Sequence, residues 1–479
     1  MKKPETAAPL LEGGEIELSI EKLAFGGKAL GRMDGFVVFV EHALPGQKVR
    51  VRVTRVKPQF AEARVVQVLG QSPAYEAPFC PHFGLCGGCQ WQDLNYAEQL
   101  RWKGLHLEEC LRHLGGFAPG LTLPAVASPE ITGYRNKMEF TFASRPSAGG
   151  GAPAPDAPGG LALGLHVWSS SREIFNLEHC FLGSAGAPLM VQEVRSFCRQ
   201  SGLPAYNPKT GKGFWRFLVF REGKRTGQTL AHLITTGQGD RDAVAALAGH
   251  LRERFPDLTT LVHSRSRTKA QIARGEHRRT LWGPGYIEER LGELRLRVSA
   301  ESFLQPNTLA AEGLYDAIRR LGEFTGRETV WDLYCGAGSI GLFLAPRVQL
   351  VVGFELDAAA VKDAVTNSRL NGLSHCRFLA GDLKERLREA MKDPASPPPQ
   401  VVIADPPRSG LHPEVVTALL ELSPPRLIYV SCNPATLARD LALLKERYAV
   451  TAIQPFDFFP HTPHIEGLVR LDRRPQAVA

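Results

Sequence analysis

The chain has 479 residues and a formal net charge of +8, which gives room for about three domains with a sizeable core. It contains no apolar run of about 18 residues, so no membrane-spanning helix is expected. Its first residues lack the apolar stretch of a signal peptide, and nine cysteines, an odd number, do not form a disulfide framework. A monomer with reduced thiols, located in the cytoplasm, is therefore expected.

The N-terminal part predicts a flexible tail over residues 1–12 and a small all-β domain over residues 13–72, in which glycine-containing pairs mark the turns. Along residues 48–54, valines alternate with Lys48 and Arg50, which places the valines on one strand face and the cations, Arg52 included, on the other. A cationic face on a small barrel suits an RNA backbone. The alternative is a solvated edge strand.

Three cysteines, Cys80, Cys86 and Cys89, lie close together in a glycine-rich segment. Such a group in a reduced protein is typical of a metal centre, and a fourth ligand has to come from elsewhere in the chain. The spacing alone does not separate an iron–sulfur cluster from a zinc site completed by His82 or His179. Both kinds of centre stay open at this point.

Residues 73–290 predict a mixed α+β central domain, in which a helix over residues 96–114 is expected to pack on the C-terminal domain. Cys110 shares a face of this helix with three leucines, so it is expected in a core. Between Arg195 and Arg279 there are 17 Lys and Arg but only 6 Asp and Glu. This excess indicates a polyanionic partner, and the alternative is a solubilising surface.

From residue 291 onward the sequence predicts an α/β domain. A strand ending near Tyr334 is followed by a turn containing Gly336 and Gly338 and then by an apolar helix. The next strand ends in Glu355, and a further strand ends just before Asp382. An acidic residue about 20 positions after the glycine turn can bind ribose hydroxyls. The domain is therefore expected to bind a nucleoside cofactor, and the turn itself fits NAD(P) as well as S-adenosylmethionine.

Two later strands also end in polar residues. Two prolines follow Asp405 and stop the strand ladder, which leaves this carboxylate at the carboxyl edge of the sheet, where ligands bind. Cys432 follows the other strand, and Asn433 and Pro434 are a good N-cap and first helical residue. The positive end of that helix is expected to lower the pKa of the Cys432 thiol and so to favour a nucleophilic thiolate. The alternative role is a small apolar turn residue.

Four segments in this order, 332–338, 405–408, 431–434 and 459–466, resemble the RumA/TrmA family of RNA (uracil-5-)-methyltransferases. The resemblance covers nearly the whole chain, is greatest to the branch that acts on 23S rRNA, and extends to a TRAM domain, an OB-like RNA-binding barrel, at residues 13–72. It implies a Rossmann-like catalytic domain at residues 291–479 that uses S-adenosylmethionine, with 23S rRNA as substrate in preference to tRNA.

Two other classes of protein stay open. An NAD-dependent iron–sulfur oxidoreductase would share the glycine turn and the cysteines but has no use for the motif around Cys432. A non-catalytic RNA-binding protein is the third possibility.

The resemblance also implies roles for single residues. Cys432 is the nucleophile that adds to carbon 6 of uracil, and Glu466 is the base that later removes the proton from carbon 5. The phenylalanines around residue 458 are expected to raise the pKa of Glu466, and the alternative is a plain surface acid. The remaining implied residues bind the cofactor, a 4Fe–4S cluster or RNA phosphates: Gln305, Tyr334, Glu355, Asp382 and Asp405 for the cofactor; Cys80, Cys86, Cys89 and Cys180 for the cluster; Arg135 and Lys137 for phosphates.

Overall fold

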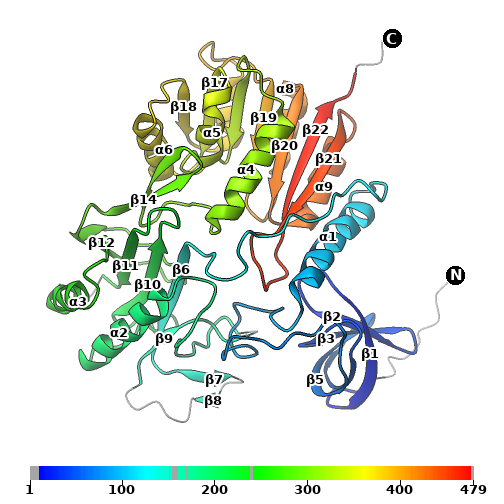
Figure 1. Cartoon of the computed structure of the whole chain (residues 1–479), viewed down its shortest axis with the longest axis vertical. Helices are drawn as coiled ribbons and strands as arrows, with labels where there is room; N and C mark the ends of the chain where they lie inside the picture. The colour runs from blue at the N-terminus through cyan, green and yellow to red at the C-terminus, as the bar shows by residue number, and fades with distance from the viewer. Residues whose placement is uncertain (1–9, 150–151, 154–159, 169, 238–240, 476–479) are drawn as a thin grey trace.

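A computed structural model of the chain describes residues 10–149, 152–153, 160–168, 170–237 and 241–475 (Figure 1). A small barrel, a central sheet with two helices and a large C-terminal sheet between helices follow one another along the chain. Within the described ranges, no helix is both long enough and apolar enough to cross a membrane.

The N-terminal strands form a closed barrel in the order β1-β2-β3-β5-β4. Its strands are β1 (Glu15–Leu23), β2 (Ala29–Met33), β3 (Phe36–Glu41), β4 (Lys48–Val56) and β5 (Phe60–Gly70). Val49, Val51 and Val53 of β4 are at most 1% exposed, as their alternation predicts. The cations on the opposite face are paired with β1: Arg50 and Lys48 with Glu17, at 2.9 and 3.6 Å, and Arg52 with Glu15, at 2.8 Å. The three cations face only two carboxylates, so contact of this face with RNA stays a prediction.

The expected tail falls partly outside the described residues, since residues 1–9 are not among them. Residues 10–12 contact the barrel at two positions. Leu10 is 6% exposed and belongs to the barrel core, and the Glu12 carboxylate accepts a 3.0 Å hydrogen bond from the Val56 backbone N–H. Leu10 and Glu12 therefore contact the barrel, whereas Leu11 between them is 81% exposed.

Helix α1 (Tyr96–His113) connects the barrel to the rest of the chain and begins at the N-cap Asn95, whose side chain accepts from the Glu98 N–H. It packs against α9 (Pro434–Leu444), and both helices lie beside the large sheet (Figure 1). Cys110 on α1 is 8% exposed within the core of the C-terminal sheet, which confirms it as a core residue. Helix α1, although it precedes the central domain in the sequence, therefore packs in the core of the C-terminal domain.

The central sheet has the order β13-β12-β11-β10-β6-β9. Two helices, α2 (Gly186–Gln200) and α3 (Arg241–Arg254), cover one of its faces and share an apolar core with it (Figure 1). The strands are β6 (Lys137–Ala143), β9 (Ala162–Gly164), β10 (Trp215–Glu222), β11 (Thr229–Thr235), β12 (Thr260–Arg265) and β13 (Arg279–Trp282), with short pairs β7 (Ser147–Gly149)–β8 (Ala152–Pro153) and β14 (Tyr286–Leu291)–β15 (Leu294–Ser299). Part of the basic excess of this region is internal, since Arg216 and Arg221 are each 2% exposed.

The C-terminal sheet has the order β18-β17-β16-β19-β20-β22-β21, parallel from β18 to β20, with β22 antiparallel to both neighbours. Its elements are α4 (Thr308–Gly322), β16 (Thr329–Leu333), α5 (Ser339–Leu344), the 3-10 helix η1 (Ala345–Arg347), β17 (Leu350–Glu355), α6 (Ala358–Leu370), β18 (Cys376–Ala380), α7 (Leu383–Ala390), β19 (Val401–Ala404), α8 (Pro413–Leu422), β20 (Arg426–Ser431), α9, β21 (Tyr448–Phe456) and β22 (Glu466–Arg473).

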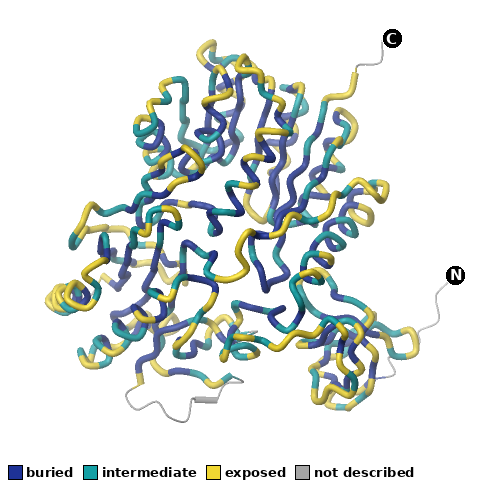
Figure 2. Tube along the Cα trace, viewed as in Figure 1, coloured by how far each residue is buried: buried dark blue, intermediate teal, exposed yellow. Residues whose placement is uncertain are grey.

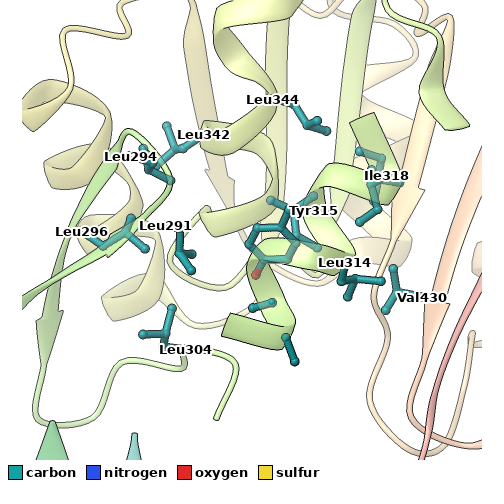
Figure 3. Close-up of a cluster of buried hydrophobic side chains, with 14 of the residues drawn as sticks. Leu291, Leu294, Leu296, Leu304, Leu314, Tyr315, Ile318, Leu342, Leu344 and Val430 are labelled. Atoms are coloured by element: carbon teal, nitrogen blue, oxygen red, sulfur yellow. The ribbon is translucent and has the colours of Figure 1, made fainter. Parts of the chain in front are cut away.

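Helices on both faces bury the strands of this sheet, which Figure 2 shows as the most continuously buried part of the molecule. On one face, Leu314 and Tyr315 of α4 pack with Leu342 and Leu344 of α5 and with Val430 of β20 (Figure 3). A parallel sheet covered on both faces is the doubly wound arrangement expected from the strand and helix pattern. Such a sheet brings its strand ends together at one edge.

Candidate active site

The carboxyl ends of the parallel strands carry nearly all of the candidate residues. Tyr334 follows β16, Glu355 ends β17, Asp382 comes soon after β18, Asp405 follows β19 and Cys432 follows β20. Because these strands are parallel neighbours, the five residues lie along one edge of the sheet. The edge has two parts with different properties.

The first part is a cavity of about 610 Å³ that Tyr334, Glu355 and Asp382 line together. Apolar side chains form much of its wall, including Leu356, which is 73% exposed. The Glu355 carboxylate accepts hydrogen bonds from the backbone N–H of Gly336 at 3.0 Å and of Asp357 at 2.8 Å. Apolar walls beside two carboxylates suit a flat base with a ribose, which needs hydrogen-bond acceptors for its hydroxyls.

Local backbone geometry places two of these side chains. Tyr334 has a φ of 61°, a left-handed conformation that is uncommon for a non-glycine residue and that often marks functional turns. Asp382 is the N-cap of α7 and accepts a 3.0 Å hydrogen bond from the Lys384 N–H, which lowers the pKa of this carboxyl. The cofactor side of the edge therefore holds a carboxylate that is charged at neutral pH.

A second cavity, of about 590 Å³, shares Glu355 and Leu356 with the first and extends toward the central sheet. Phe303 and Lys137 also line it. The Lys137 ammonium lies 2.5 Å from the Glu139 carboxylate, so its predicted contact with an RNA phosphate stays a prediction. The Arg135 guanidinium lies 5.8 Å from the centre of the Phe459 ring, close to the loop that precedes Glu466.

The second part of the edge is a compact group around Cys432. Gln305 Nε2 donates a 3.0 Å hydrogen bond to Asp405 Oδ2. Ser431 pairs with Gly467 across β20 and β22, which makes Cys432 and Glu466 neighbours on adjacent strands. Burial raises the pKa of Asp405 to about 7. The structure thus brings together four residues that are far apart in the sequence.

Glu466 is 4% exposed, opposite Phe456 across β21 and β22 and near the fully buried Phe458. Burial raises the pKa of Glu466 well above its usual value, and the Asp405 charge raises it further. The expectation of a raised pKa is confirmed, and the alternative of a plain surface acid is wrong. Burial therefore favours the neutral form of this carboxyl.

The expectation for the Cys432 thiol is wrong. Its pKa is raised to about 11, first by burial and then by the Glu466 charge, with Asp405 adding to this and only Arg408 opposing it strongly. Asn433 does cap α9, accepting from the Ala435 N–H at 3.1 Å. The helix end is therefore present as predicted, but desolvation and two nearby carboxylates outweigh it.

The four cysteines predicted to bind a metal centre form a separate group. Cys80, Cys86, Cys89 and Cys180 line one small cavity of about 20 Å³. In the part of the chain that the structure describes, no group of three or more His, Cys, Asp or Glu side chains is arranged to hold a single metal ion. Thiols are the donors that iron–sulfur clusters and many zinc sites use, so the kind of centre predicted for these cysteines stays a prediction.

A zinc site completed by His82 fits less well. His82 Nε2 accepts from the backbone N–H groups of Glu178 and His179, both at 3.3 Å, so this nitrogen is already engaged. His179 lines the same cavity as the four thiols, so a zinc site completed by this histidine stays open beside an iron–sulfur cluster.

Sequence reasoning missed a buried ion pair beside the site. Lys103 Nζ of α1 lies 2.6 Å from Asp457 Oδ1, and both side chains are 0% exposed. The available signal was the position of Gln99, Lys103 and His106 on the apolar side of α1, next to Leu107. Polar residues at core positions of a helix indicate buried polar contacts, but their partner in the sequence cannot be read from one helix.

Comparisons with known proteins agree with this arrangement. Residues 246–474 match the family model described as tRNA (Uracil-5-)-methyltransferase, and residues 9–66 match that of the TRAM domain. An uncharacterized RNA methyltransferase of Nitratidesulfovibrio vulgaris is 41% identical over 464 residues, which cover 96% of this chain and 97% of that protein. The chain belongs to the RumA/TrmA family of RNA (uracil-5-)-methyltransferases.

Two further relatives of this methyltransferase extend the comparison. An uncharacterized RNA methyltransferase of Chlorobaculum tepidum is 38% identical over 471 residues, with 96% of this chain and 97% of that protein covered. The crystal structure of the Pyrococcus abyssi tRNA (uracil-54, C5)-methyltransferase in complex with S-adenosyl-L-homocysteine matches with a TM-score of 0.72 and 27% identity. That match covers 95% of this chain and 100% of the Pyrococcus chain.

Proposed function

We propose that this methyltransferase forms 5-methyluridine in 23S rRNA through a covalent bond between Cys432 Sγ and carbon 6 of the target uracil. The observation that carries the proposal is the position of Cys432. It lies at the sheet edge, next to Glu466 and Asp405 and along the same edge as the cofactor cavity. A nucleophile, two carboxyls that can take protons and a nucleoside cavity are the groups that this reaction needs.

Each residue has a defined task in this scheme. Cys432 transfers its proton to the neighbouring Asp405 carboxylate and adds to carbon 6, and the electrons of the carbon 5–carbon 6 double bond form an enolate. S-adenosylmethionine supplies an electrophilic methyl group for carbon 5 of that enolate. The Glu466 carboxylate then removes the proton from carbon 5, the double bond re-forms, and Cys432 leaves as a thiolate.

The raised pKa values explain why the thiol is not reactive by itself. Cys432 has a pKa of about 11 because burial and two carboxylates disfavour its anion. A positive charge placed near these groups favours their anionic forms, and a sulfonium carries such a charge. Arg408 already acts in this direction on Cys432. The nucleophile is therefore activated when the methyl donor is bound.

Gln305 and Asp405 belong to the group around Cys432. Their 3.0 Å hydrogen bond fixes both side chains near Cys432. We infer that Tyr334, Glu355 and Asp382 bind the adenosine part of the cofactor, whereas Gln305 and Asp405 face the methyl group and the target base. The target uridine has to leave any base stack to reach Cys432.

We also propose that Cys80, Cys86, Cys89 and Cys180 hold a 4Fe–4S cluster with a structural role. The four-thiol lining of their common cavity supports this assignment. The methylation scheme needs no electron transfer, so the cluster is not assigned a step in it. Iron and sulfide analysis of anaerobically purified protein should give about four of each per chain.

The choice of RNA has two candidates. The TRAM barrel and the full cysteine set support 23S rRNA, as in the branch that the sequence resembles most. The match to a tRNA (uracil-54, C5)-methyltransferase over 95% of the chain favours tRNA as the second candidate. Separate reactions with 23S rRNA and tRNA from cells without the enzyme, using a labelled methyl donor, decide between them. Label in 5-methyluridine of 23S rRNA alone is the expected result.

A further inference from the structure

The residues just before Glu466 form a buried loop, residues 457–465, which joins β21 to β22 and is called the base loop here. Phe458 is 0%, Thr462 3% and His461 4% exposed. A buried segment without regular structure needs hydrogen-bond partners for its backbone. Residues from outside the C-terminal sheet supply several of them.

The first anchor is the ion pair of Lys103 and Asp457. Besides its 2.6 Å contact with Asp457, the Lys103 ammonium donates a 3.0 Å hydrogen bond to the Phe459 backbone oxygen. Asp457 Oδ1 also accepts from the Phe459 N–H at 2.9 Å. Buried ion pairs contribute little net stability because desolvation is costly, and they do fix geometry. This pair therefore fixes the beginning of the base loop on α1.

The second anchor is the backbone of His461. Its oxygen accepts from the N–H groups of Gln90 and Trp91, at 2.8 and 3.0 Å, and its N–H donates to Gln99 Oε1 at 2.8 Å. His461 has a φ of 66°, which a non-glycine residue adopts only when its surroundings hold it there. Gln90 directly follows Cys89, so the cysteine segment itself contacts the base loop.

The third anchor is Tyr134. Its hydroxyl donates a 3.2 Å hydrogen bond to the Pro460 backbone oxygen, and its ring is 2% exposed. The ring packs in one apolar cluster with Cys89 and Leu182. Tyr134 therefore lies between the cysteine cavity and the base loop and contacts both.

We propose that Tyr134, together with Lys103, is a positioning residue for the base Glu466. This inference rests on the proposed function of Cys432 and Glu466. Both residues touch the base loop a few residues before Glu466, and neither lines the cofactor cavity. Loss of either contact lets the loop shift, which moves the Glu466 carboxylate away from the carbon 5 proton of the methylated adduct.

The step that should suffer is elimination. Cys432 is carried by β20 and α9, and the cofactor residues belong to other strand ends, so addition and methyl transfer persist. Deprotonation of carbon 5 then becomes slow, and the methylated uracil stays bonded to Cys432. A displaced general base can cost about tenfold or more in rate.

The test compares Tyr134→Phe with Tyr448→Phe. Tyr448 is a matched control, since its ring is 1% exposed and its hydroxyl donates a 3.1 Å hydrogen bond to a proline oxygen, that of Pro424. Both substitutions remove one buried hydroxyl and should lower the melting temperature by a similar amount. Turnover, KM for RNA and the amount of denaturation-resistant RNA–protein adduct are measured for both variants and the wild type.

The expected result is about tenfold lower kcat for Tyr134→Phe with accumulated methylated adduct and unchanged KM, while Tyr448→Phe behaves like the wild type. A folded Lys103→Met variant should show a larger loss of kcat and more methylated adduct than Tyr134→Phe. If Lys103→Met does not fold, Tyr134→Phe alone tests the inference. Equal kcat and equal adduct in the two tyrosine variants would overturn the inference alone. A wild-type enzyme that forms no 5-methyluridine in any RNA would overturn the proposed function and this inference with it.

Discussion

The two parts of the strand edge shift the pKa values of their carboxyl groups in opposite directions. On the cofactor side, Asp382 is half-exposed and its pKa is lowered by a backbone N–H group. On the reacting side, burial raises the pKa of Asp405 to about 7 and that of Glu466 well above its usual value. A binding carboxylate works when it is permanently charged. A reacting group works better when it changes protonation during the reaction.

The largest expected effect is on the reacting side alone. Cys432→Ser should lower the methylation rate by at least about 10⁴-fold, because a serine hydroxyl is a far weaker nucleophile. The affinity for S-adenosylmethionine should stay unchanged, since Cys432 does not line the cofactor cavity. Single-turnover methyl transfer and equilibrium dialysis measure the two quantities. If Cys432→Ser lowered both the methylation rate and the affinity for S-adenosylmethionine, the separation of a reacting side from a cofactor side would be contradicted.

Glu466→Gln should reduce turnover by about 10²- to 10⁴-fold, the usual range for a general base. Unlike Cys432→Ser, this variant keeps its nucleophile, so it should form a covalent adduct with normal RNA that carries the transferred methyl group. Gel electrophoresis under denaturing conditions with labelled methyl donor detects it. A variant that turns over at the wild-type rate would remove Glu466 from the mechanism.

The Cys432 pKa should respond to the charge of the ligand in the cofactor cavity. A group with a pKa of about 11 reacts with iodoacetamide ever faster as pH rises toward that value, because only the thiolate reacts. A cationic amine analogue of the donor should lower the midpoint of this profile by about one to three units. Neutral S-adenosylhomocysteine is the control and should leave the midpoint nearly unchanged. Equal midpoints with both ligands would contradict activation by charge.

The smallest expected effect lies on the cofactor side. Glu355→Gln replaces a charged acceptor in the cofactor cavity and should weaken S-adenosylmethionine binding about tenfold, as expected for one hydrogen bond to a charged group. The rate at saturating cofactor should change little. Titration calorimetry and kcat measure the two effects. A large loss of kcat at saturation would instead place Glu355 among the reacting groups.

The strand-end positions could be predicted because they depend on local sequence. Two prolines after Asp405 and the Asn433-Pro434 pair after Cys432 mark where strands stop and where a helix begins. Parallel order then brings these ends together. Local patterns also located the buried valines of β4.

The features of the site and the barrel that the sequence did not predict depend on contacts between distant segments. The pKa of Cys432 is raised first by burial and then by Glu466 on the neighbouring antiparallel strand β22, whose register the sequence does not state. The paired cations of β4 follow from its register with β1, which sets Glu17 opposite Arg50. Lys103 and Asp457 are 354 positions apart and meet only because α1 packs on the last domain.

The most direct measurement is mass spectrometry of the enzyme after reaction with target RNA containing 5-fluorouridine, with S-adenosylmethionine present. Fluorine at carbon 5 cannot leave as a proton does, so the reaction should stop at the methylated adduct. The account predicts one RNA-derived mass attached to the peptide that contains Cys432. Full methylation of normal RNA with no adduct, or an adduct on a different cysteine, would contradict it.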